Sequence, residues 1–153
     1  MPHKRSAPIL AVIVLLAAIP TLSCHQAAVS ASISDLKSYP LNYDGKIVRV
    51  SGWLTSEHLG VFVESENRQD AIRLRSPDVV ATRLPVQRDY LFDKFWKMVE
   101  TKIDDSGSRG IHVELDGLFR VLKKDGKPAE EFFVFGQWPE EIITLRIRKI
   151  INK

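Results

Sequence analysis

Hydrophobic and polar residues alternate along several segments of the chain, which is the pattern of β-strands with one buried face. Between Lys46 and Leu54, for example, Val48 and Val50 share a face with Leu54, and Arg49 lies on the other. Alternation or a short apolar run predicts further strands at residues 59–64, 71–75, 111–119, 132–135 and 143–151. The pattern therefore predicts a mainly β domain.

One segment changes from the two-residue period of a strand to the period of a helix. Between Arg88 and Ile103, apolar residues recur every three or four positions, and charged residues lie between them. Pro85 precedes the segment, and the polar residues 104–110 follow it. We therefore predict one amphipathic helix between the third and fourth strands.

Two of the predicted strands match each other. Residues 48–54 align with residues 113–119, so that each has two inward apolar residues, a glycine and a final apolar residue. The matched glycines are Gly52 and Gly117. Glycine inside a strand marks a bulge or a sharp bend, which closing a sheet into a barrel requires.

Three strands, a helix and then a strand with the same glycine is an order that resembles the OB-fold. Residues 44–52 and 113–119 are similar to the first and fourth strands of OB-fold domains in bacterial envelope proteins. The resemblance extends over about residues 39–151 and implies an α+β, mainly β fold: an OB-like antiparallel barrel of five to six strands, with the amphipathic helix between strands 3 and 4. A small β-sandwich with one helix is the alternative.

The N-terminal residues have the composition of an export signal. A basic start precedes an apolar run from Ile9 to Ile19, which is shorter than the roughly 20 residues that cross a bilayer but suits a signal peptide. The following Thr21-Leu22-Ser23-Cys24 resembles a bacterial lipobox, which implies cleavage before Cys24 and acylation of its sulfur. We therefore assign residues 1–23 to a lipoprotein signal peptide and Cys24, the only cysteine, to a lipid anchor.

Other processing of this region remains open at the level of sequence. An ordinary signal peptidase cutting after Ala28 or Ala31 would discard Cys24 and leave a soluble periplasmic or secreted protein. A retained helix is disfavoured by the short apolar run. If Cys24 is acylated, His25 in place of aspartate favours the periplasmic side of the outer membrane, by analogy with the sorting rule of Gram-negative lipoproteins.

Length and composition predict the domain boundaries, and the net charge bears on which partners to expect. The 153 residues suit one domain, so we assign the Ala/Ser-rich residues 24–38 to a tether and residues 39–153 to the barrel. The formal net charge of +3 falls to +1 beyond Cys24, because Lys4 and Arg5 are the only charged side chains before it. A charge so close to zero gives little reason to expect nucleic acid as a partner.

The outward side of the predicted strands carries a candidate binding surface, since OB-folds commonly bind ligands on the second and third strands and nearby loops. Its cations and aromatic rings are Arg49, Trp53, Phe62, Arg73 and Arg75. These residues predict binding of a protein or a small polar ligand, with single-stranded nucleic acid or an oligosaccharide as the alternative. Arg146, Arg148 and Lys149 predict a basic edge that discourages strand pairing or contacts anionic headgroups.

No catalytic, cofactor or metal-binding motif is apparent in the sequence. His58, His112 and Asp116 are a conceivable metal set, but they lack a pair at ligand spacing, so surface histidines are the better interpretation. Nothing like a nucleophile elbow surrounds Ser51 or Ser76. We therefore predict a non-enzymatic, membrane-anchored binding module of the cell envelope without a cofactor, with an envelope protein as a candidate partner.

Overall fold

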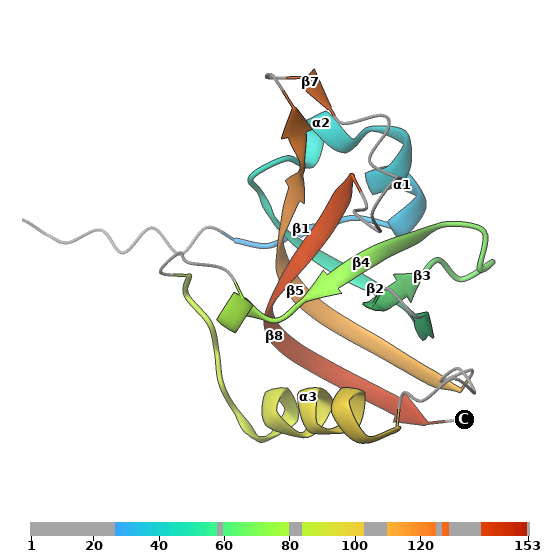
Figure 1. Ribbon diagram of the computed structural model, residues 1–153, viewed down its shortest axis with the longest axis vertical. Helices are drawn as coiled ribbons and strands as arrows, with labels where there is room; N and C mark the ends of the chain where they lie inside the picture. The colour runs from blue at the N-terminus through green and yellow to red at the C-terminus, as the bar shows by residue number, and fades with distance from the viewer. Residues whose placement is uncertain are drawn as a thin grey trace, which may run out of the picture.

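The computed structural model describes residues 27–57, 60–79, 84–102, 110–124, 127–128 and 139–152, and these form a small β-barrel (Figure 1). The main sheet contains β1 (Val29–Ser30), β2 (Ile47–Glu57), β3 (Gly60–Glu64), β4 (Ala71–Arg75), β8 (Glu140–Asn152) and β5 (Ile111–Val121), in that spatial order. β2 also pairs with β5, so β2, β3, β4, β8 and β5 close into a ring. A separate two-stranded ladder joins β6 (Lys123–Lys124) to β7 (Lys127–Pro128).

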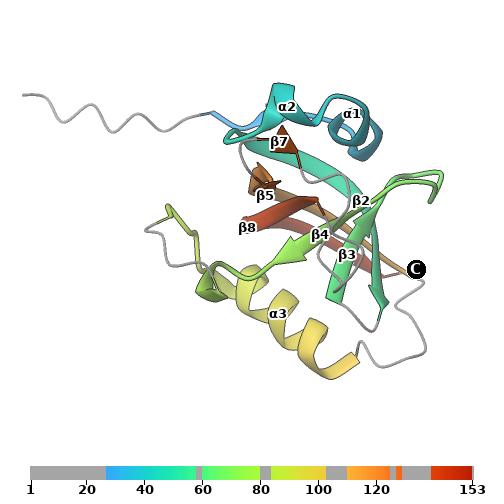
Figure 2. The ribbon, with the colours of Figure 1, turned by 45° about the horizontal axis from the view of Figure 1, so that its top comes forward.

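Helices lie at both ends of this barrel (Figures 1 and 2). One end has α1 (Ile33–Ser38) and α2 (Pro40–Tyr43); α3 (Tyr90–Lys102), preceded in the chain by the 3₁₀ turn η1 (Pro77–Val79), lies at the other. Polar residues start both longer helices. Ser32 and Asp35 form a capping box for α1, and the Asp89 carboxylate accepts a hydrogen bond from the Phe92 N–H at 3.0 Å in the first turn of α3.

The predicted mainly β, OB-like barrel, with its helix between the third and fourth barrel strands, is confirmed. The ring is antiparallel except at one pairing, where β4 and β8 run parallel, with Leu74 opposite Ile142. Strand direction can alternate around a closed ring only if the number of strands is even. A five-stranded ring therefore needs at least one parallel pair.

The two matched glycines lie where neighbouring strands approach most closely. A Cβ atom on Gly52 would lie 2.1 Å from the Glu64 carbonyl oxygen of β3, and one on Gly117 would lie 2.3 Å from Ile142 Cγ2 of β8. No larger side chain fits at either position without moving the adjacent strand. Both glycines thus permit the tight contacts of the closed barrel. The sequence predicts a bulge or sharp bend at these positions, whereas the reason for glycine in the structure is the close approach of the neighbouring strand.

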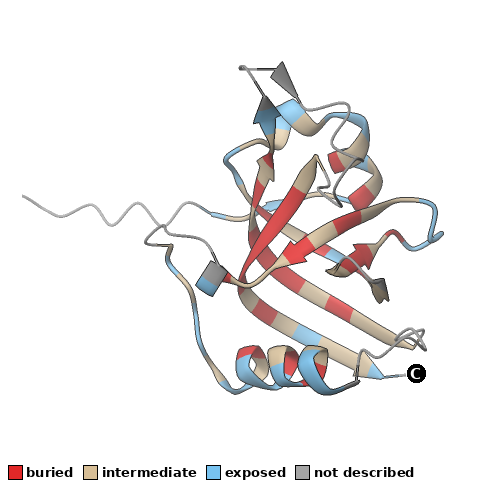
Figure 3. Ribbon diagram, in the orientation of Figure 1, coloured by how far each residue is buried: buried red, intermediate tan, exposed pale blue. Residues whose placement is uncertain are grey.

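The hydrophobic core fills the barrel and continues to both helical ends (Figure 3). Alternate residues of the strands supply its centre, and α3 adds Phe92, Phe95 and Met98. The core members from the two strands with matched glycines are Val48, Val50, Leu54, Val113, Leu115, Phe119 and Val121. The alternation predicted for these two strands is therefore correct.

Residues 29–38 are part of the folded domain, so their assignment to a tether is wrong. β1 pairs in parallel with β2, with Val29 opposite Val48. Ile33 and Leu36 of α1 are 1% and 0% exposed, because residues three apart share one helix face and this face covers the core. The domain begins at Val29 or before it, not at Tyr39.

Several predictions lie outside the described residues. They are the signal peptide at residues 1–23, the anchor at Cys24 and the strand at residues 132–135. Within the part of the chain that is described, no helix has the length and apolar character needed to span a membrane.

Candidate functional site

The outer face of β2, β5 and β8 arranges side chains in rows across the three strands. Arg49 of β2 lies opposite Asp116 of β5, which lies opposite Arg146 of β8. One row along, Ile47 lies opposite Leu118, which lies opposite Ile143. Because side chains two residues apart point to the same face of a strand, a charged row and an aliphatic row lie side by side.

Two irregularities in β8 add further side chains to this face. The register between β5 and β8 shifts between Glu114 and Leu115, and again between Asp116 and Gly117. At these shifts Arg148 and Leu145 have no Cα partner on β5. A bulged residue breaks the alternation of a strand and redirects its side chain. This explains why Leu145, which strict alternation places inside the barrel, lies among the outer-face residues.

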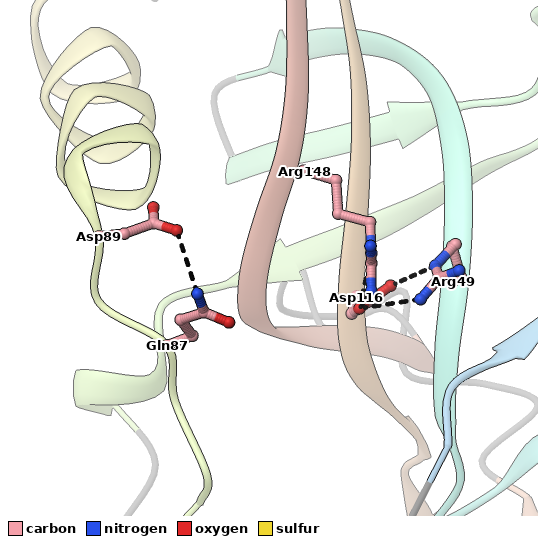
Figure 4. A network of polar contacts seen from close by, with 5 residues as sticks. All are labelled: Arg49, Gln87, Asp89, Asp116 and Arg148. Carbon is pink, nitrogen blue, oxygen red and sulfur yellow. Dashed lines mark hydrogen bonds and ion pairs between the residues drawn. The ribbon is translucent and has the colours of Figure 1, made fainter.

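Asp116 holds two arginines together at the centre of the charged row (Figure 4). Its carboxylate is approached from one side by Arg49, whose Nε donates to Oδ1 at 2.8 Å, and from the other by Arg148, whose Nε donates to Oδ2 at 2.8 Å. Arg148 Nη2 also lies 2.8 Å from Oδ2. Asp116 is 7% exposed, whereas the arginine side chains keep 35% and 28% of their surface. The network therefore positions two guanidinium groups that remain accessible.

These contacts keep Asp116 ionised. Burial, the largest single effect, raises the pKa of the carboxyl group, but hydrogen bonds and charges from Arg148 and Arg49 together outweigh it and lower the pKa below its usual value. The pKa of Arg148 is raised, mainly by its hydrogen bond to Asp116 and also by the charge of Glu114. Both groups are thus charged at neutral pH.

A groove of about 1060 Å³ runs over this face. We call it the arginine groove. It is lined by Ala27, Ala28, Ile47, Arg49, Leu84, Pro85, Val86, Gln87, Asp116, Leu118, Leu145, Arg146 and Arg148. The chain between η1 and α3 supplies one set of lining residues, 84–87, and is joined to β8 by a hydrogen bond from the Gln87 N–H to the Leu145 carbonyl at 2.8 Å. Gln87 lies on that segment in Figure 4.

The arginine groove is both aliphatic and cationic. Three arginines and one aspartate line it, which gives these side chains a formal net charge of +2. Arg146 forms no ion pair with any residue that the structure describes. Ligand sites are typically clefts of about 300–1,000 Å³ lined largely by apolar groups with a few polar anchors. The groove has this character and the charge to select an anionic group.

The five predicted binding residues do not form one surface. Arg49 lines the arginine groove. Trp53, two rows further along β2, meets His112 edge-on with ring centroids 5.0 Å apart, and the Arg68 guanidinium lies 4.9 Å from the centre of its indole ring. Trp53 is therefore half-buried among neighbours and does not present an open stacking face.

The other three predicted residues lie on β3 and β4. Phe62 lies opposite Arg73 of β4 and is 1% exposed, so its assignment to an open ligand-binding face is wrong. Arg75 Nε lies 3.4 Å from Glu141 Oε2. Alternation along a strand predicts to which side of the sheet a side chain points, but it does not show what packs against that side. The burial of Phe62 therefore could not be predicted from the alternation.

Ser51, His112 and Glu66 form a smaller polar cluster on the same barrel face. Glu66 Oε1 lies 2.7 Å from His112 Nε2, and Ser51 Oγ lies 3.5 Å from the same nitrogen. A serine–histidine–acid relay places serine and acid on different ring nitrogens. The cluster therefore lacks the arrangement that would activate Ser51. Among the described residues, no group of three His, Cys, Asp or Glu side chains is placed to hold a metal ion.

Sequence reasoning missed the role of Asp116, which joins Arg49 of β2 to Arg148 of β8. The sequence predicts that Arg146 and Arg148 point outward, but the pairing of Arg148 with Asp116 depends on strand register. The available signal was the presence of opposite charges on the outward side of three strands, and it becomes specific only when the register is known.

Comparisons with known proteins do not identify a family. No family model matches the chain, and no curated protein matches it. Among solved structures, the OBody AM3L09 bound to hen egg-white lysozyme is 20% identical, with a TM-score of 0.42 over 73% of this chain and 87% of that one. A putative aspartyl-tRNA synthetase from Leishmania major Friedlin is 11% identical, with a TM-score of 0.44 over 88% of this chain and 23% of that one. Likenesses this distant carry no argument, so the barrel assignment rests on the strand pairing itself.

Proposed function

We propose that this chain is a non-enzymatic binding module of the bacterial envelope, anchored to a membrane through acylated Cys24, and that the arginine groove is its binding surface. The observation that carries the proposal is the groove itself, where Asp116 holds two accessible guanidinium groups beside an aliphatic floor. A rigid sheet that presents preorganised charged groups suits binding, because few side chains need to be ordered when the ligand arrives.

The start of the folded domain supports a close association with the membrane. A tether ending at Tyr39 would reach about 50 Å from Cys24 when extended. Val29 of β1 follows Cys24 by only five positions, which span about 18 Å at most. An acylated Cys24 would therefore hold the barrel against the membrane surface. Cleavage after Ala31 would also remove β1, which pairs with β2, so the position of β1 favours processing upstream of it.

We do not propose binding of single-stranded nucleic acid. Such binding relies on exposed aromatic faces that stack on bases and on a continuous cationic track. Phe62 is buried, and Trp53 has Arg68 over its ring. Arg75 lies within ion-pair distance of Glu141. Three of the five residues that suggested this ligand, Trp53, Phe62 and Arg75, are thus engaged within the protein.

The anchor is tested by expressing the full chain in a Gram-negative host and measuring the mass of the mature N-terminus. We expect a chain that begins at acylated Cys24 and fractionates with the outer membrane. A Cys24→Ser variant should lose the acyl mass and the membrane association. A Ser23→Ala variant, which keeps a small residue before the cysteine, serves as the matched control and should be processed normally. An unmodified start at Val29 or Ser32 would show that the anchor does not exist.

A further inference from the structure

We propose that the arginine groove binds one anionic phospholipid of the membrane that holds the chain, with the lipid phosphate at the arginines and an acyl chain over the aliphatic half. This inference rests on the proposed anchoring, because the anchor brings the groove to its ligand. It assigns a ligand class to a surface formed by the first, fourth and fifth strands of the barrel.

The aliphatic half of the groove suits a flexible hydrocarbon chain. Ile47 and Leu118 lie opposite each other on β2 and β5, and bulged Leu145 of β8 lies on the same face. Leu84 and Val86, from the segment before α3, add further branched aliphatic groups. No aromatic ring lines the groove among the described residues. Its apolar contacts are therefore with saturated carbon, and a stacking ligand would gain little there.

The charged half suits a phosphate. Guanidinium groups donate parallel hydrogen bonds that match phosphate oxygens. Asp116 neutralises one positive charge and fixes Arg49 and Arg148 through hydrogen bonds at 2.8 Å. Arg146, in the same row and without an ion pair to any described residue, supplies a further cation. An anion bound here would meet a net positive site that is ordered before binding.

The position of the groove relative to the anchor selects a membrane lipid over a peptide. Ala27 and Ala28 line the groove, and Ala27 follows Cys24 by three residues, which reach about 11 Å at most. An acylated Cys24 would therefore keep one wall of the groove within about 11 Å of the residue that carries the acyl chains. The acyl chains on Cys24 carry no phosphate, so they would leave the arginines without a partner.

The test is a lipid titration of the acylated mature protein in neutral detergent, followed by native mass spectrometry. The probes are dioctanoyl phosphatidylglycerol, dioctanoyl phosphatidylcholine and glycerol 3-phosphate. We expect one phosphatidylglycerol per chain, with weaker binding of the other two probes because one lacks net charge and the other lacks acyl chains. Arg146→Gln should weaken phosphatidylglycerol binding about tenfold, equivalent to about 1.4 kcal/mol.

Matched variants separate this outcome from a loss of folding. Arg146 has no ion pair with the described residues, so Arg146→Gln should melt like the parent protein. Lys149→Gln removes an exposed cation of the same strand that does not line the groove, and it should bind lipid normally. Ile47→Asn places a polar, uncharged side chain in the aliphatic half and should weaken phosphatidylglycerol binding while leaving glycerol 3-phosphate binding unchanged.

Several results would overturn the proposal: equal binding of the two lipids, equal binding of glycerol 3-phosphate, an unchanged affinity in Arg146→Gln, or stronger binding of an acidic decapeptide. These results are distinct from failure of the anchor. An acylated chain that shows no preference for phosphatidylglycerol contradicts only the lipid site. An unacylated chain that binds it through Arg146 contradicts only the anchor.

Discussion

Replacing Asp116 tests the construction of the arginine groove. In Asp116→Asn the side chain keeps its size but loses the charge that balances Arg49 and Arg148. An asparagine oxygen can accept a hydrogen bond from one arginine, but its NH₂ group then faces the donors of the other. We therefore expect the variant to fold with a lower free energy of unfolding.

The magnitude follows from the burial of the three groups. Breaking a fully buried ion pair costs about 3–5 kcal/mol, and an exposed pair is worth about 0–1 kcal/mol. Asp116 is 7% exposed, but the two arginine side chains keep 35% and 28% of their surface and can turn toward water. The cost should lie between these limits, at about 2 kcal/mol.

The effect should depend on pH in a defined direction. The folded protein holds the pKa of Asp116 below its usual value, so the ionised carboxylate stabilises the fold fully above the unfolded pKa of about 3.9. This contribution is lost as the pH falls through the lower, folded pKa. The difference in stability between the parent and Asp116→Asn should therefore be full at pH 7 and shrink at acidic pH.

Urea unfolding of the two proteins at a series of pH values measures this difference. With a slope of about 2 kcal/mol per molar urea, the midpoint should fall by about 1 M at pH 7. Asp78→Asn is the control, because Asp78 pairs with Arg88 at a position where its side chain is 63% exposed, and it should change stability by less than about 1 kcal/mol. A midpoint equal to that of the parent at pH 7, or a difference that stays constant to pH 2, would refute the reasoning.

Two further predictions concern the fold. Leu36→Ala should lower the free energy of unfolding by about 2–5 kcal/mol in urea, because Leu36 is fully buried. Leu41→Ala, at an exposed position, is the control and should have little effect. Equally small effects of the two substitutions would mean that α1 is not docked on the core. Gly117→Ala places a Cβ atom 2.3 Å from Ile142 Cγ2 and 2.8 Å from the Ile143 carbonyl oxygen. This overpacking should destabilise the fold by about 1–3 kcal/mol or more, and the melting temperature should fall. An unchanged melting temperature would contradict the close approach of β5 and β8.

The strands with matched glycines show how much of the fold was predictable. Alternation along residues 48–54 and 113–119 depends on local chain geometry, since side chains two residues apart share a face in any strand. The inward residues and the need for Gly52 and Gly117 could therefore be predicted without knowing which strands were neighbours. The same local pattern could not show that residues 29–38 dock onto the barrel, because Ala and Ser are compatible with both a tether and a helix start.

The candidate site was predicted less well, and Phe62 and Asp116 show why. Alternation places Phe62 on the same side of the sheet as Arg73, which the strand pairing confirms, but its burial depends on segments distant in sequence. The sequence suggests Asp116 only as one member of a conceivable metal set with His58 and His112. Its partners are instead Arg49, 67 positions away, and Arg148, 32 positions away. Closure of the barrel brings these three side chains together in space, although they are far apart in the sequence.

The sequence by itself determined the main strand and helix pattern, the positions of Gly52 and Gly117 and the prediction of an export signal that ends before Cys24. These depend on local periodicity and on short motifs. Only the tertiary structure decided that β4 and β8 run parallel, that α1 belongs to the domain and that bulges at Leu145 and Arg148 complete a groove. The physical reason is that strand register and barrel closure bring together residues far apart in the chain, and no local pattern encodes which residues will meet.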